Sequence, residues 1–110
     1  MDSPPAIMRA IEHVESRGNF FAVSKSGCIG VMQINPKWSK FPKPMLFIPQ
    51  INRMEANRIL NYWYSLSNRD WIKTLAAYRC GFHGLKGDCG MGYANKILRL
   101  SLIHISEPTR

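Results

Sequence analysis

The apolar residues of this chain recur at the spacing of amphipathic helices, and only short, ambiguous runs alternate as a strand would. The first such pattern consists of Ile7, Ala10, Ile11 and Val14. Residues three and four positions apart share one face of a helix, so the pattern predicts a helix over residues 4–17. Ser3 offers a capping hydroxyl before two prolines, and Gly18 stands where a helix would end.

The same periodicity predicts three further helices. Their expected ranges are 52–67, 71–80 and 93–103, with a glycine-rich loop over 81–92 before the last of them. The chain between the first two helices is expected to hold a loop over 19–29, a short helical turn over 30–35 and an irregular, proline-rich stretch over 36–50. The predicted class is all-α, with one domain over residues 1–103 and a polar, disordered tail over 104–110.

Length and composition fit one globular domain. The chain has 110 residues, of which 45% are hydrophobic and 20% are charged, as is usual for a domain with a single core. No apolar run approaches the roughly 18 residues that span a bilayer, so we expect no membrane insertion. The opening Met-Asp-Ser-Pro-Pro lacks the basic and apolar regions of a signal peptide. We therefore expect export by another route, action where the protein is made, or a fragment of a longer chain.

The charge of the chain is strongly positive. It has 15 basic and 7 acidic residues, which gives a net charge of +8. Such an excess raises encounter rates with polyanions, among them nucleic acid, anionic lipid and the bacterial wall. The basic residues are scattered and form no run of five, which argues against nucleic acid, because its binding proteins carry a basic stripe or patch. Solubility alone is the simpler explanation of the charge.

The three cysteines do not form a metal-binding pattern. Neither a Cys-x-x-Cys nor a His-x-x-x-His spacing occurs, so we expect no metal site and no cofactor. Cys80 and Cys89 flank the glycine-rich loop, where a disulfide and two reduced thiols are equally compatible with the sequence. Cys28 lies among glycines and isoleucine and is expected to be a small, buried filler.

One acidic residue lies in an unusual position on the first predicted helix. With 100° between successive residues, Glu15 falls at the margin of the apolar arc, whereas Glu12 lies nearer to solvent. Glu15 is also in the last turn, where the helix dipole disfavours a carboxylate. Partial burial and the dipole both raise the pKa of a carboxyl group, which suits a general acid. The plainer interpretation is a surface glutamate beside Arg17 or Lys25.

A catalytic acid needs groups that hold a substrate against it. The polar candidates are Ser16, Ser24, Gln33, Asn35 and Tyr78. The aromatic candidates for stacking on sugar rings are Trp38, Tyr62, Trp63 and Tyr93. Core packing is the alternative for the aromatic residues, and we favour it for Trp63 and Trp71. Gly27 and Gly30 would let the backbone approach a ligand closely.

The order of these residues resembles a known family. The motifs are Glu15-Ser16-x-Gly18-Asn19, Ala22-Val23-Ser24 and Gly27-Cys28-Ile29-Gly30-Val31-Met32-Gln33. At this spacing they resemble the soluble lytic transglycosylase domain. Residues 52–60, 76–81 and 93–98 are similar to later blocks of the family, so that the resemblance covers residues 7 to 100. Arg79, Cys80 and Ala56 depart from it, standing where the family has asparagine, alanine and glycine.

The resemblance implies a small lysozyme-like helical fold that acts, without a cofactor and as a monomer, on peptidoglycan. It implies cleavage of the β-1,4 bond from N-acetylmuramic acid (MurNAc) to N-acetylglucosamine (GlcNAc), with a 1,6-anhydro product. Glu15 matches the single catalytic glutamate. The substrate-binding residues expected are Ser16, Ser24, Met32, Gln33, Tyr78 and Tyr93. Of these, Ser16 would form hydrogen bonds at the site, Met32 and Gln33 would line the cleft, and Tyr78 would approach and orient the glutamate.

Two alternatives remain from the residues themselves. A hydrolytic, goose-type lysozyme on the same fold would need a second carboxyl group to position water, for which Glu55 and Asp88 are the candidates. A module that binds the wall without cutting it would need no acid at all. A wall-cutting domain of this size and without a signal peptide suits a phage lysin, a virion enzyme or a component of a secretion system.

Overall fold

The computed structural model describes the backbone of residues 2–106 and the side chains of residues 2–103. Its elements are α1 (Pro5–Glu15), η1 (Pro36–Trp38), α2 (Lys43–Leu46), α3 (Pro49–Leu66), α4 (Trp71–Cys80), α5 (Phe82–Leu85) and α6 (Met91–Ser106). The described residues contain no strand, only isolated antiparallel bridges. The all-α class predicted from the sequence is therefore confirmed.

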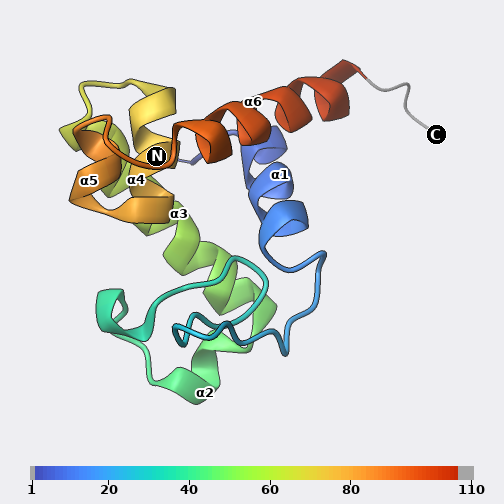
Figure 1. Cartoon of the computed structure of the whole chain (residues 1–110). Helices are drawn as coiled ribbons and strands as arrows, with labels where there is room; N and C mark the ends of the chain where they lie inside the picture. Colours follow the sequence, from blue (N-terminus) through green and yellow to red (C-terminus); the bar gives the residue numbers. More distant parts are fainter. Residues whose placement is uncertain (1, 107–110) are drawn as a thin grey trace.

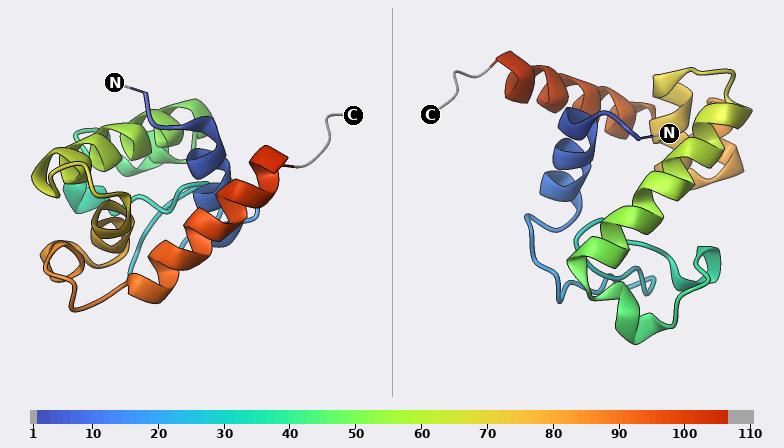
Figure 2. Two further views of the ribbon diagram at one scale, coloured as in Figure 1. Left: turned by 90° about the horizontal axis from the view of Figure 1, so that it is seen from above. Right: turned by 180° about the vertical axis from the view of Figure 1, so that it is seen from behind.

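The four longer helices pack around one core. α6 crosses one end of the molecule and packs against both α1 and α4, and α4 packs in turn against α3 and α5 (Figure 1). The segment between α1 and α3, with the short α2, occupies the opposite end of the molecule (Figure 2). This arrangement leaves the C-terminal end of α1 facing that segment.

The predicted apolar face of α1 lies in the core. Ile7, Ala10 and Ile11 are 6%, 0% and 0% exposed. They share one hydrophobic cluster with residues of α3, α4 and α6, among them Leu60, Leu75 and Ile97. Burying a single isoleucine stabilises the fold by about 1.5–3 kcal/mol. Packing of this face therefore holds α1, and the residue at its end, in one position relative to the other helices.

The ends of α1 differ from the prediction. The helix ends at Glu15 because Arg17 and Gly18 both have positive φ values, 54° and 81°, which a right-handed helix does not allow. At the other end the N-cap is Pro4, without a side-chain cap. The hydroxyl of Ser3 is buried, and no described residue hydrogen-bonds to it. The predicted Ser3 cap is therefore wrong.

A buried asparagine connects the segment after α1 to α3. The amide of Asn52, which is 0% exposed, donates to the carbonyls of Ile29 and Leu46, each at 2.8 Å, and its oxygen accepts from the Met32 amide at 2.8 Å. Gly30 lies against it with a φ of 83°, where a Cβ would meet Asn52 and the Leu46 carbonyl oxygen. The turn after Gly30 is consequently fixed by tertiary contacts.

Residues 30–35 do not form the predicted helical turn. They form a hydrogen-bonded turn in which Ile29 and Ile34 exchange backbone hydrogen bonds, each at 2.9 Å. Ile29 also bridges to Val23. The segment thus forms a small set of antiparallel bridges. Its apolar residues are buried in the core, and Asn52 of α3 hydrogen-bonds to its backbone.

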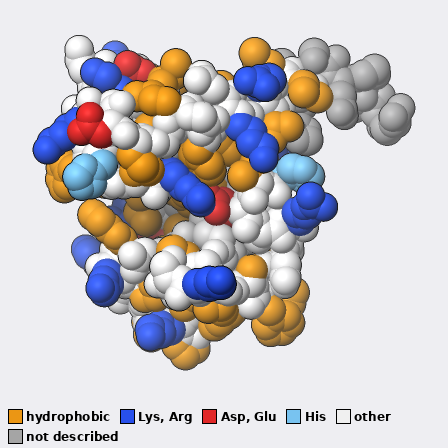
Figure 3. All heavy atoms as spheres, in the orientation of Figure 1, with side chains coloured by type: hydrophobic (Ala, Val, Ile, Leu, Met, Phe, Trp, Pro, Cys, Tyr) orange, Lys and Arg blue, Asp and Glu red, His pale blue; other side chains and the backbone are white. Residues whose placement is uncertain are grey.

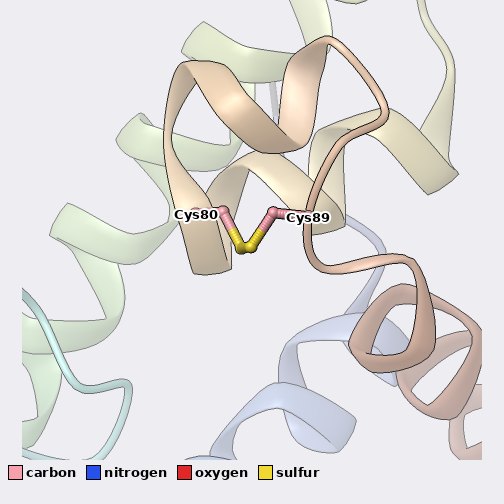
Figure 4. Close-up of a disulfide and its surroundings, with 2 residues drawn as sticks. All are labelled: Cys80 and Cys89. Atoms are coloured by element: carbon pink, nitrogen blue, oxygen red, sulfur yellow. A yellow bond between two sulfur atoms is a disulfide. The ribbon is translucent and has the colours of Figure 1, made fainter.

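The glycine-rich loop is tightly packed. Cys80 and Cys89 form a disulfide with a Cα–Cα distance of 6.1 Å, so the structure adopts the disulfide of the two alternatives (Figure 4). α5 lies inside this loop, where the Cα of Gly84 is so close to the backbone of Ala76 that a Cβ would clash. The disulfide and this contact hold the loop against the end of α4.

The last helix is longer than predicted. α6 begins at Met91 and ends at Ser106, whereas the sequence predicted 93–103. Residues 104–106, the start of the expected tail, are therefore helical in backbone. Residues 107–110, for which disorder was expected, lie outside the described residues. No helix within the described range has both the length and the apolar character required to cross a bilayer.

Candidate active site

Glu15 is the last residue of α1, and its side chain is only 11% exposed. The position follows from the sequence, because the apolar face of α1 is buried and Glu15 lies at the edge of that face. The helix dipole places negative partial charge at this end of α1. A carboxyl group is thus held, mostly out of water, where its ionised form is disfavoured.

Two side chains contact the carboxyl group of Glu15. The hydroxyl of Tyr93, in α6, donates a hydrogen bond to Glu15 Oε2 at 2.7 Å. The guanidinium of Arg79, in α4, approaches Glu15 Oε1 with its Nη1 at 4.0 Å. Arg79 also lies over the Tyr93 ring, 5.5 Å from its centroid, within the range of a cation–π contact. Three helices therefore meet at this carboxyl group.

Burial dominates the electrostatics of the site. It raises the pKa of Glu15, and the Tyr93 hydrogen bond and the Arg79 charge oppose this shift only in part. Burial, together with the charge of Glu15, also raises the pKa of Tyr78 and of Tyr93. Both phenols therefore keep their protons at neutral pH. The site holds a carboxyl group whose protonated form is favoured by burial, beside a permanent hydroxyl donor.

The hydroxyl that contacts Glu15 comes from Tyr93 and not from Tyr78. Tyr78, expected to orient the glutamate, donates its hydroxyl to the carbonyl of Met32 at 2.7 Å. Tyr93, expected to stack on a sugar ring, makes the hydrogen bond to Glu15. Tyr78 lines the hollow beside Glu15, but its hydroxyl holds the 30–35 turn. The sequence offered no signal to separate them, because which tyrosine reaches Glu15 depends on how α6 packs against α1 and α4.

Two of the expected binding residues serve the fold. The side chain of Met32 is 0% exposed in the core, so the expectation that it lines the cleft is wrong. The hydroxyl of Ser16 donates to the Val31 carbonyl at 2.8 Å and accepts from the Gly18 amide at 3.0 Å. Ser16 therefore joins the end of α1 to the 30–35 turn. These bonds fix the backbone next to Glu15.

Gln33 and Ser24 do line the hollow with Glu15. Gln33 has a φ of 54°, and its Nε2 donates to the carbonyls of Gly30 and Ala22 at 3.1 and 3.3 Å. These bonds fix the carboxamide and leave its oxygen as the acceptor for a ligand. The Ser24 hydroxyl accepts from the Cys28 amide and contacts the Ser26 hydroxyl, both at 3.0 Å.

The site lies in a groove made of two hollows. The hollow around Glu15 has a volume of about 390 Å³, and an adjoining one has about 310 Å³. Four residues line both: Cys28, Gln33, Tyr78 and Arg79. The second hollow is walled by Trp38, which is 46% exposed, and by Trp63, which is 2% exposed. Figure 3 shows a hollowed area on this face with an acidic side chain beside basic ones.

The position of Cys28 in this groove corrects the expectation of a buried filler. Its side chain is partly exposed and lines both hollows. Trp63, in contrast, packs in the core as expected. Trp38 is the exposed aromatic residue of the groove wall, and its ring lies 5.9 Å from that of Trp63. The groove is therefore polar near Glu15 and aromatic at its other end.

The other described carboxyl groups lie outside the two hollows. Glu55, 3% exposed, accepts from the Ser39 hydroxyl at 2.8 Å and pairs with Arg58, whose hydrogen bond lowers the Glu55 pKa. Asp88 is exposed in the loop after α5. Asp70 caps α4 by accepting from two backbone amides. Among the residues that line the two hollows, Glu15 is the only acid.

Metal ligands do not gather at the site. The described residues include no group of three or more His, Cys, Asp or Glu side chains placed to hold a metal ion. The polar groups at the site are the Glu15 carboxyl group, the Tyr93 hydroxyl and the Arg79 guanidinium.

An all-α domain with a polar and aromatic groove, and one buried carboxyl group at the end of its first helix, has the features of the lysozyme-like class. The family model for the transglycosylase SLT domain matches residues 1–97, and the chain belongs to this family. The resemblance noted in the sequence is thereby confirmed, and at the family level it connects the chain with transglycosylase action on peptidoglycan. Searches of curated proteins and of solved structures gave no match.

Proposed function

We propose that this protein is a peptidoglycan lytic transglycosylase in which Glu15 is the only catalytic acid and base. The observation that carries the proposal is that one carboxyl group lies in the groove, mostly buried and hydrogen-bonded by Tyr93 at 2.7 Å. The family supplies the substrate class. The bond cleaved is the β-1,4 link from MurNAc to GlcNAc.

The reaction needs two proton transfers, one from Glu15 and one to it. In its protonated form, which burial favours, Glu15 donates its proton to the glycosidic oxygen as the bond to C1 of MurNAc breaks. The resulting carboxylate then takes the proton of the MurNAc 6-hydroxyl as that oxygen bonds to C1. The products are the GlcNAc chain end and a 1,6-anhydro ring, and no water is consumed. Glu15 finishes protonated, as it began.

The neighbours of Glu15 suit both steps. Burial favours the acid form before the first proton transfer. The Tyr93 hydroxyl and the Arg79 charge stabilise the carboxylate after it, because both favour the ionised form. Gln33 presents a fixed carboxamide to the same hollow and fits the acetamido group of a sugar. Trp38 offers an exposed ring at the other end of the groove.

A hydrolytic mechanism is the weaker candidate. It requires a second carboxylate, with about 5 to 9.5 Å between the two groups, to activate water or to form a covalent intermediate. Glu55 is buried in its pair with Arg58, and Asp88 lies outside the two hollows. Mass spectrometry of the products from purified wall distinguishes the two mechanisms. We expect anhydro-MurNAc ends, whereas hydrolysis would give ends heavier by one water.

The substitution Glu15→Gln tests the role of the acid. We expect cleavage of purified wall to fall by at least about a thousandfold, since no other acid lines the groove. Circular dichroism should be unchanged, because the amide is isosteric. Glu12→Gln, three residues earlier on α1, is the matched control and should keep its activity. Wall-degrading activity that survives Glu15→Gln would remove Glu15 from the mechanism. Native protein that binds the wall without cleaving it, with binding unchanged in Glu15→Gln, would instead favour a binding module.

A further inference from the structure

Arg79 is placed to contact a ligand and not only Glu15. Its side chain is 58% exposed and lines both hollows of the groove. A guanidinium has five N–H donors in a planar fork. Its one described polar contact is the approach to Glu15 at 4.0 Å, which is too long for a hydrogen bond. Most of its donors therefore face the groove without a partner among the described residues.

An arginine–glutamate pair elsewhere in the chain has the geometry of a full salt bridge. Arg53 grips the carboxylate of Glu12 with two hydrogen bonds, from Nε at 2.8 Å and from Nη2 at 3.1 Å. Such bidentate geometry is the usual one where arginine serves a single carboxylate. Arg79 instead rests its guanidinium over the Tyr93 ring. This contact holds the group in place and leaves its hydrogen-bonding edge open.

The charge balance of the groove is positive. Lys25, from the segment after α1, lines the hollow around Glu15 together with Arg79. The two come from different elements and face one acid, Glu15. A site of this kind attracts an anionic group on the ligand.

We propose that Arg79 determines specificity by pairing with a carboxylate of the peptide stem carried by the substrate's MurNAc, with Lys25 as a second cation nearby. This inference rests on the proposed peptidoglycan substrate, whose stem peptides are the anionic groups beside the scissile bond. The protein thus favours glycan strands with free stem carboxylates over strands in which these are neutral.

The test compares two preparations of one substrate. Soluble glycan strands with their stems are divided, and the carboxylates of one half are converted to amides with carbodiimide and ammonia. We expect kcat/KM of the native protein to be about five- to tenfold higher on the acid form, as charge-assisted hydrogen bonds imply. Arg79→Gln should bring this ratio close to one. Arg79→Lys should keep part of it, since lysine retains the charge but not the fork.

The matched control is Arg99→Gln, which makes the same chemical change at an exposed position of α6 outside the two hollows. It should keep the ratio of the native protein, because it changes only the net charge. The proposal is overturned if native protein cleaves both forms equally. It is also overturned if Arg79→Gln slows both forms alike and shifts the pH profile, since Arg79 would then act only on Glu15.

Binding gives the same comparison without turnover. Calorimetric Kd values for Glu15→Gln, alone and combined with Arg79→Gln, are measured on the acid and amide strands. A preference for the acid form that disappears with Arg79→Gln supports the proposal even if native protein cleaves neither form, a result that would refute the proposed function alone. A preference that persists in the double variant overturns the role of Arg79 and leaves the proposed function intact.

Discussion

Removing one hydroxyl, with Tyr93→Phe, tests the electrostatics of the site most directly. The hydroxyl donates to Glu15 at 2.7 Å, and a hydrogen bond to a charged group contributes about 1.5–3 kcal/mol. The carboxylate forms only partly in the transition state, so about half of this, about 0.8–1.5 kcal/mol, should appear in the barrier. We expect kcat to fall by about four- to thirteenfold.

The pH dependence should change in a defined direction. The Tyr93 hydrogen bond lowers the pKa of Glu15, which burial raises. Without the hydroxyl the pKa rises further, so Glu15 keeps its proton to higher pH. Activity that requires the protonated acid is lost as pH rises through this pKa. The alkaline limb of the pH–kcat profile should therefore move to higher pH in Tyr93→Phe.

Tyr78→Phe is the matched control, since it removes the same atom from a tyrosine whose hydroxyl is bound to the Met32 carbonyl at 2.7 Å. That bond is between neutral groups and contributes about 0.5–1.5 kcal/mol to the stability of the fold. We expect a smaller loss of kcat and an unmoved alkaline limb, measured on dye-labelled wall across pH 4–9. The reasoning fails if both variants lose activity equally and neither shifts the profile.

Three further predictions concern stability. Asn52→Ala should lower the free energy of unfolding by about 3 kcal/mol, since it leaves buried backbone groups unpaired. Urea denaturation measures this change, and Asn95→Ala, at an exposed position, is the control. Replacing Cys80 and Cys89 by serine should cost about 2–3 kcal/mol in thermal unfolding, from a sequence separation of 9, and an unchanged midpoint would show that packing alone holds the loop. Glu15→Gln should be more stable than the native protein at pH 7 and equal to it near pH 3. Because folding raises the pKa of Glu15, the native protein loses stability as pH rises from the unfolded-state pKa of this group through its folded-state pKa. Equal stability of Glu15→Gln and the native protein at both pH values would contradict this prediction.

Local pattern in the sequence was sufficient for the four longer helices and for the position of Glu15, but not for the short helices η1, α2 and α5. The spacing of Ile7, Ala10 and Ile11 defines the buried face of α1, and a helix with one buried face necessarily places Glu15 at its margin. Both follow from the geometry of a single helix, which the chain specifies within a few residues. The ends of the helices were predicted less accurately, because helix caps depend on backbone torsions such as the positive φ of Arg17.

The partners of that acid were decided by the tertiary structure. Whether Tyr78 or Tyr93 reaches Glu15 depends on how α4 and α6 cross α1, and no local pattern contains that angle. The packing of the helices also decides that Met32 is buried in the core and that Arg79, in α4, lines the groove. The sequence thus determined which groups each helix presents, and the packing of the helices determined which of those groups meet, because contacts between distant segments form only when the core closes.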